Sequence, residues 1–182
     1  MASNALFVLI MTFSLSEAVR TLPKLSALKG ESKLSYELVH PLHKVVATTK
    51  NFLCEIELLE ETQEIQSVEF RAEVTSFDSG NSNRDAHALE VVEALLYPEV
   101  VFQSERIENQ QDKLRVSGKL TFHGVTQPIN FTARKRIVGS KLVVEGETEI
   151  SLTAFKVERP ALFFVKVEDA LKISFEIAFA LT

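Results

Sequence analysis

The chain has 182 residues, of which 46% are hydrophobic and 25% charged, a composition typical of one globular domain with a sizeable core. Its formal net charge is -5 and its basic residues are scattered, which argues against nucleic acid or an anionic membrane surface as a partner. A single cysteine, Cys54, excludes an intramolecular disulfide.

The N-terminus has features of an export signal. The apolar run at residues 5–15 is shorter than the roughly 20 residues that a membrane-spanning helix needs. Ser-Glu-Ala at residues 16–18 is a small-x-small pattern typical of a signal-peptidase site, although no basic residue precedes Arg20. We therefore expect residues 1–18 to be a signal peptide, residues 19–182 to form the mature domain, and the protein to be periplasmic or secreted. The alternative is a mature terminal strand or a docked helix.

From about residue 33 onward, apolar and polar residues alternate with a period of two, which predicts strands with one apolar and one charged face. Leu114 and Phe122, for example, share a face opposite Arg115 and Lys119. The strand at 100–107 is less regular, because its apolar residues fall on both faces. The eight predicted strands cover residues 33–40, 52–58, 67–74, 100–107, 113–123, 129–137, 141–152 and 171–181.

Strands with one charged face are incompatible with a parallel sheet that helices cover on both sides. A single sheet of this size leaves its apolar face bare unless it packs on another sheet or closes on itself. The connections between successive strands are mostly short, which favours an antiparallel meander. The predicted fold class is therefore all-β, an eight-stranded antiparallel barrel, with a two-sheet sandwich as the alternative.

One segment, between the third and fourth predicted strands, has a helical period instead. Its apolar residues are Ala88, Val91, Val92, Leu95 and Leu96. Ser82 and Asp85 resemble a capping box, and Pro98 is expected to end the helix. We expect one short helix that covers one end of the barrel.

Two histidines, His40 and His43, have a spacing found in metal sites, and Cys54 follows along the chain. Pro41 prevents a regular helix there, and no carboxylate cluster accompanies the histidines. We interpret both as partly exposed residues at a strand end, and Cys54 as an inert residue on an apolar strand face. Because the chain also lacks a serine-nucleophile motif, we predict no metal, no cofactor and no enzymatic activity.

His123 precedes Gly124 in the turn between two predicted strands. Phe122 continues the apolar face of its strand, so alternation places His123 on the outer, solvent-exposed face. Gly124 supplies a backbone conformation that other residues resist. We interpret His123 as a turn neighbour without a catalytic role.

Three motifs in this order resemble the YceI-like family, bacterial proteins of a lipocalin-like barrel class that bind polyisoprenoid lipids. They are SFDSGNSNRDAH at Ser76–His87, YPEVVF at Tyr97–Phe102 and LTFHGVTQPI at Leu120–Ile129. The resemblance extends from Lys33 to Thr182, although the G-x-F element that usually opens the second strand is absent. It implies an eight-stranded lipocalin- or streptavidin-like barrel, a periplasmic address and an apolar ligand held inside. It makes no residue a reaction centre.

An eight-stranded barrel is either filled by side chains or holds one small ligand. We expect an exported, non-enzymatic protein whose aromatic inner face binds an apolar lipid, with Tyr36 as a polar handle. The resemblance implies that this lipid is an isoprenoid chain. The predicted cavity-lining residues are Tyr36, Leu38, Phe52, Phe70, Phe102, Leu120, Phe122, Phe131, Ile173, Phe175 and Phe179. One alternative is a ligand-free interaction module of the cell envelope that acts through its outer surface or rim, with phenylalanines that only pack on one another. Another is a metal-dependent enzyme that uses His40 and His43, with Cys54 as a further candidate ligand.

Overall fold

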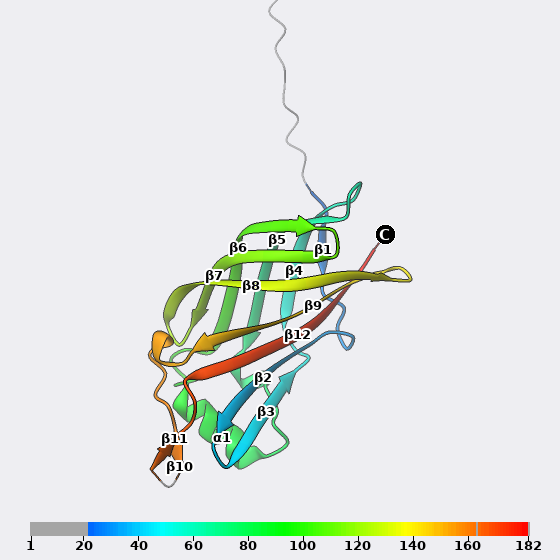
Figure 1. The fold of residues 1–182 in the computed structure, drawn as a ribbon. Coiled ribbons are helices and arrows are strands. Elements are labelled where there is room, and N and C mark those ends of the chain that lie inside the picture. Colours follow the sequence, from blue (N-terminus) through cyan, green and yellow to red (C-terminus); the bar gives the residue numbers. More distant parts are fainter. Residues whose placement is uncertain (1–21, 163, 182) are drawn as a thin grey trace, which may run out of the picture.

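A computed structural model describes residues 22–162 and 164–181 (Figure 1). Ten strands form one antiparallel sheet in the order β1-β4-β5-β6-β7-β8-β9-β12-β2-β3. They are β1 (Lys24–Ser26), β2 (Lys33–His40), β3 (His43–Thr49), β4 (Leu53–Leu59), β5 (Glu64–Glu73), β6 (Glu99–Gln110), β7 (Lys113–Phe122), β8 (Val125–Val138), β9 (Lys141–Ser151) and β12 (Ala170–Ala180). A separate hairpin pairs β10 (Ala161–Leu162) with β11 (Val165–Lys166), and the helices are η1 (Val74–Ser76), α1 (Ser82–Val91) and η2 (Thr153–Phe155).

The expected all-β, antiparallel class is confirmed, but the expected number of eight strands is wrong. The two additional strands of the sheet are β1, which pairs with β4, and β3, which pairs with β2. β1 has three residues, too few to show a period in the sequence. β3 begins at His43, directly opposite His40 across a two-residue turn, so the two histidines predicted to lie at a strand end flank a tight hairpin.

The sheet curls strongly, and its apolar face turns inward (Figure 1). Isolated bridges hold the curl: Ala27 pairs with Phe179 of β12, and Thr48 of β3 pairs with Asp78. In the described part of the chain, no continuous ladder joins the two edge strands. The molecule is therefore a curled half-barrel of one sheet, neither a fully closed eight-stranded barrel nor a two-sheet sandwich.

The irregular alternation at 100–107 has a structural cause in β6. The pairing of β6 with β7 shifts register between Ser104 and Arg106. Such a bulge inserts one extra residue, so the side chains beyond it change faces. Val100 and Phe102 before the bulge and Ile107 after it therefore all reach the interior.

The helix α1 lies between β5 and β6, across the lower end of the curled sheet in Figure 1. Its cap is Asn81 rather than Ser82, because the Asn81 side chain accepts a hydrogen bond from the Arg84 amide at 3.1 Å. The helix ends at Val91, well before Pro98, and Glu93 then adopts a left-handed backbone with φ of 48°. No helix among the described residues has the length and hydrophobicity to cross a bilayer.

Candidate functional site

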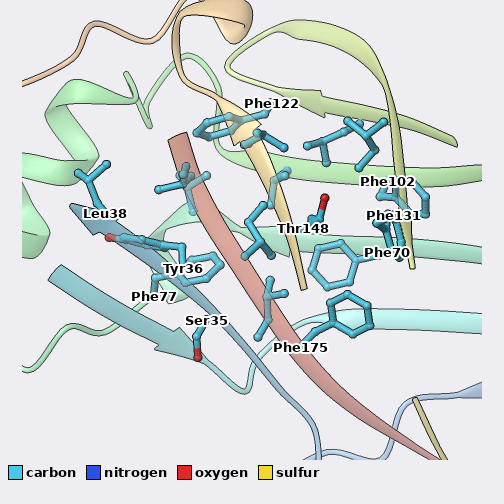
Figure 2. Close-up of a pocket in the computed structure, with 18 of the residues that line it drawn as sticks. Ser35, Tyr36, Leu38, Phe70, Phe77, Phe102, Phe122, Phe131, Thr148 and Phe175 are labelled. Carbon is cyan, nitrogen blue, oxygen red and sulfur yellow. The ribbon is translucent and has the colours of Figure 1, made fainter. Parts of the chain in front are cut away.

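The curled sheet surrounds an apolar cavity with a volume of about 450 Å³ (Figure 2). Most of the residues predicted to line a cavity lie around it: Tyr36, Leu38, Phe70, Phe102, Leu120, Phe122, Phe131, Ile173, Phe175 and Phe179. Phe52 is buried but lies outside the lining, with its ring centroid 5.4 Å from that of Phe70. It precedes the start of β4, so the alternation of that strand does not direct its side chain.

The aromatic side of the cavity is built by three phenylalanines in contact (Figure 2). The ring centroid of Phe131 lies 5.5 Å from that of Phe102 and 5.8 Å from that of Phe175. Two glycines make room for the outer rings: a Cβ atom added at Gly118 or at Gly146 would lie 2.6 Å from a ring atom of Phe102 or Phe175, respectively. The rings thus pack on one another and still leave a cavity beside them, so packing and ligand space coexist.

The charged residues of the cavity lining are of one sign. The lining residues include no aspartate, glutamate or lysine, although the whole chain has a net charge of -5. Arg84 is the lining residue with a permanent charge, and the other polar members are Ser35, Tyr36, His40, His43, His87 and Thr148. The sequence motifs contained Arg84 and His87, but not the information that α1 places both at the cavity.

Tyr36 and Arg84 form a polar end to this cavity. The Tyr36 ring packs against Phe77 with centroids 5.3 Å apart, and no hydrogen bond within the described residues engages its hydroxyl. Burial raises the pKa of the Tyr36 phenol, the carboxylate of Asp85 raises it further, and the guanidinium of Arg84 lowers it. The phenol is therefore a neutral hydrogen-bond donor within the electrostatic reach of Arg84.

The turn before α1 fixes the position of Arg84. Its Nε donates to Ser79 Oγ at 2.9 Å and its Nη2 donates to the Ser79 carbonyl at 2.6 Å. The Asp85 carboxylate accepts from the Ser79 amide at 3.2 Å and also from the Ser79 hydroxyl. Arg84 and Asp85 thus both bind Ser79, and no hydrogen bond to another described residue engages Nη1 of Arg84.

His40 is buried, contrary to the expected partial exposure, whereas His43 is exposed. The Leu42 amide donates to His40 Nδ1 at 3.2 Å, so Nε2 carries the proton and donates to the Val165 carbonyl at 3.1 Å. His40 therefore connects the β2–β3 turn to β11.

No group of three or more metal-ligating side chains gathers in the described residues, and Cys54 does not join the two histidines. The Cys54 side chain is buried in the core, and this burial raises the pKa of its thiol to about 12. A metal-dependent enzyme centred on His40 and His43 finds no support in this geometry.

The expectation that His123 faces solvent is wrong, since its side chain is 8% exposed. Its Nδ1 lies 3.0 Å from the Phe155 carbonyl, and its Nε2 lies 2.8 Å from a carboxylate oxygen of Glu93. The backbone explains the error: His123 has a φ of 49°, and strand alternation does not apply to a turn residue in the left-handed region. His123 lies outside the cavity lining and ties the segment after α1 to η2.

Parts of the sequence are similar to known proteins. A stretch of 64 residues is 39% identical to the UPF0312 protein VPA0850 of Vibrio parahaemolyticus, covering 34% of this chain and 34% of that protein. A stretch of 62 residues is 32% identical to Protein YceI of Escherichia coli O157:H7, covering 33% of this chain and 32% of that protein. The chain thus spans about a third of the length of these curated relatives in the matched stretches.

Solved structures share the fold over most of the chain. The crystal structure of Burkholderia cenocepacia BcnA has a TM-score of 0.75 at 22% identity, covering 84% of this chain and 98% of that one. A domain from Saccharophagus degradans, described as a polyisoprenoid binding domain, has a TM-score of 0.69 at 11% identity, covering 89% of this chain and 100% of that one. In addition, residues 27–179 match the model of the YceI-like domain. A curled antiparallel sheet around an apolar cavity and a match over this length together show that the chain belongs to the YceI-like family.

Proposed function

We propose that this protein is an exported, non-enzymatic carrier that holds an apolar lipid of the polyisoprenoid type inside its curled sheet. The observation that carries the proposal is the cavity of about 450 Å³ with its aromatic and aliphatic lining. This volume falls within the range of about 300–1,000 Å³ found for small-molecule sites. Each Å² of apolar ligand surface removed from water contributes about 25 cal/mol, so a hydrocarbon chain gains affinity from burial alone.

The polar end of the cavity supports a lipid with a head group rather than a plain hydrocarbon. Arg84 and Tyr36 both offer hydrogen-bond donors there, and no carboxylate competes for them from the lining. A head group that accepts hydrogen bonds therefore suits this end, with its chain extending toward Phe131 and Phe175. The description of the Saccharophagus degradans domain as polyisoprenoid-binding supports the isoprenoid class for the chain.

The absence of a catalytic role is part of the proposal. The buried Cys54 thiol, with a pKa of about 12, stays protonated at neutral pH and is a poor nucleophile. His40 uses both ring nitrogens in hydrogen bonds to backbone groups, and His123 contacts Phe155 and Glu93 outside the lining. Binding without covalent change is the function that these side chains support best.

The test is organic extraction of the protein purified from its native host, followed by mass spectrometry of the extract. We expect one isoprenoid-type lipid in near-stoichiometric amount. The variant Thr148→Phe places a ring in the cavity and should lower the lipid content, whereas Thr132→Phe adds the same ring at an exposed position of β8 and should not. Wild-type protein without lipid would instead favour a ligand-free interaction module, and equal lipid content in the two variants would show that the lipid does not occupy the cavity.

Export is the second part of the proposal, and it concerns residues that lie outside the described part of the chain. The apolar run at 5–15 and the Ser-Glu-Ala at 16–18 support cleavage after Ala18. Mass spectrometry of the intact protein from its host should give a chain that begins at Val19. A chain that still begins at Met1 would contradict a cleaved signal peptide.

A further inference from the structure

Two neighbouring hairpins carry exposed apolar residues at their tips. Leu42, in the turn between β2 and β3, is 70% exposed, and Phe164, in the turn between β10 and β11, is fully exposed. Val165 beside it is also exposed. Exposed aromatic and aliphatic side chains of this size are unfavourable in water and mark contact surfaces when they gather in one place.

Two hydrogen bonds join the hairpins that carry these tips. His40 Nε2 donates to the Val165 carbonyl at 3.1 Å, and the Glu168 amide donates to the Val39 carbonyl at 2.8 Å. Both hairpins lie at the same end of the molecule as α1 in Figure 1. The apolar tips therefore form one surface, which we define as Leu42, Phe164 and Val165 and call the tip surface.

The tip surface lies at the cavity. His40 and His43, on either side of the Leu42 turn, line the cavity, and so do Ala161 and Val167, on either side of the β10–β11 turn. Arg84 and His87 of α1 line the same cavity. The apolar tips thus adjoin a part of the cavity lining that includes Arg84 and histidines and that contains no carboxylate.

We infer that the tip surface docks on the surface of a lipid bilayer and inserts its apolar side chains among the lipid head groups. The inference rests on the proposed lipid-binding function. An insoluble lipid avoids water on its way between a membrane and the cavity only when the cavity faces that membrane. The three side chains of the tip surface are also far fewer than the roughly 20–30 residues that each partner contributes to a stable protein interface.

The net charge of -5 indicates which interaction would drive the docking on a membrane. It argues against attraction of the whole molecule to an anionic surface, so the apolar side chains supply the affinity. Amphipathic surfaces of this kind bind in proportion to the apolar area that they bury in the interface. Binding should therefore occur on uncharged vesicles and depend little on salt.

The experiment is flotation of the protein, as recovered from its host, with vesicles of phosphatidylcholine alone. The double variant Leu42→Ser/Phe164→Ser should partition about tenfold more weakly than wild type. The matched control is Ile137→Ser/Val138→Ser, which removes two exposed apolar residues next to the β8–β9 turn, at the opposite end of β9 from η2 and β10. This control should bind within about twofold of wild type. All three proteins share one N-terminus, so any contribution from residues 5–15 is common to them.

Several results would overturn the inference. Equal flotation of the double variant and wild type would show that the tips do not bind membranes, as would a complete lack of wild-type binding. Binding that appears only when phosphatidylglycerol is added, and that disappears in high salt, would show attraction by charge. Loss of a dimer in the double variant by sedimentation, with flotation unchanged, would assign the tips to a second copy. Lipid extraction from wild type tests the proposed function separately, since a protein that contains lipid but does not float keeps the function and loses the docking surface.

Discussion

Phe122 and His123 are neighbours at the end of β7, yet different parts of the molecule bury them. The Phe122 ring lines the cavity and packs against Phe155, with centroids 5.8 Å apart. The His123 ring bonds to the Phe155 carbonyl and to Glu93, and it packs edge-on against Tyr97 at 4.7 Å. His123 thus stabilises the fold by a polar contact that strand alternation does not predict.

Replacement of His123 by alanine should destabilise the protein by about 2–4 kcal/mol, because it leaves the buried Phe155 carbonyl without its donor and opens a small void. The measurement is urea unfolding at pH 7. His87→Ala is the matched control, since His87 is exposed and should change stability by about 0.5 kcal/mol or less. Similar values for the two variants would contradict the structural role of His123.

Cys54 illustrates the effect of burial on reactivity. With a thiol pKa raised from 9.0 to about 12, the thiolate fraction at pH 8 falls roughly a thousandfold. The native protein should therefore react with a thiol reagent at pH 8 far more slowly than the protein unfolded in urea. Comparable rates in the two states would show that Cys54 is accessible.

At the scale of elements, Asp169 connects the end of β9 to the start of β12. Its carboxylate accepts from the Ser151 hydroxyl at 2.6 Å and from the Thr153 amide at 2.9 Å, which holds η2 against the sheet. The Ser151 hydrogen bond and the Thr153 amide lower the pKa of Asp169 below its usual value of 3.8. The folded state therefore binds the proton less readily than the unfolded state.

The sign of the resulting pH dependence follows from linkage. A carboxyl group with a depressed folded pKa contributes stability above its unfolded pKa and loses it as the pH falls through the folded value. The stability of Asp169→Asn should hence fall less steeply than that of wild type between about pH 5 and pH 3. Urea unfolding across this range measures the difference. Parallel curves for the two proteins would contradict the assigned contribution of Asp169.

At the scale of the whole molecule, the cavity couples ligand binding to stability. A ligand that binds only the folded state adds about 2.7 kcal/mol to the unfolding free energy at a free concentration of 100 times its Kd. Protein stripped of lipid should therefore unfold at a lower temperature than protein as purified. Adding the extracted lipid back should restore the original transition. Identical unfolding of stripped and loaded protein would show that the lipid lies outside the folded interior.

The sequence alone determined the all-β class, the antiparallel order of the long strands and most of the inward-facing side chains. The physical reason is local: in a strand, successive side chains alternate between faces, so the positions of Leu114, Leu120 and Phe122 follow from their spacing. Apart from Phe52, the residues predicted to line a cavity lie around it for the same reason.

Only the tertiary structure decided where alternation ends and distant segments meet. β1 is a strand because β4 pairs with it, and His123 turns inward because a left-handed backbone removes it from the pattern of β7. The polar end of the cavity depends on the proximity of segments far apart in the chain, such as α1, which carries Arg84, and β2, which carries Tyr36. The period of one strand contains no information about such contacts, because they arise when the sheet curls and brings α1 over its open end.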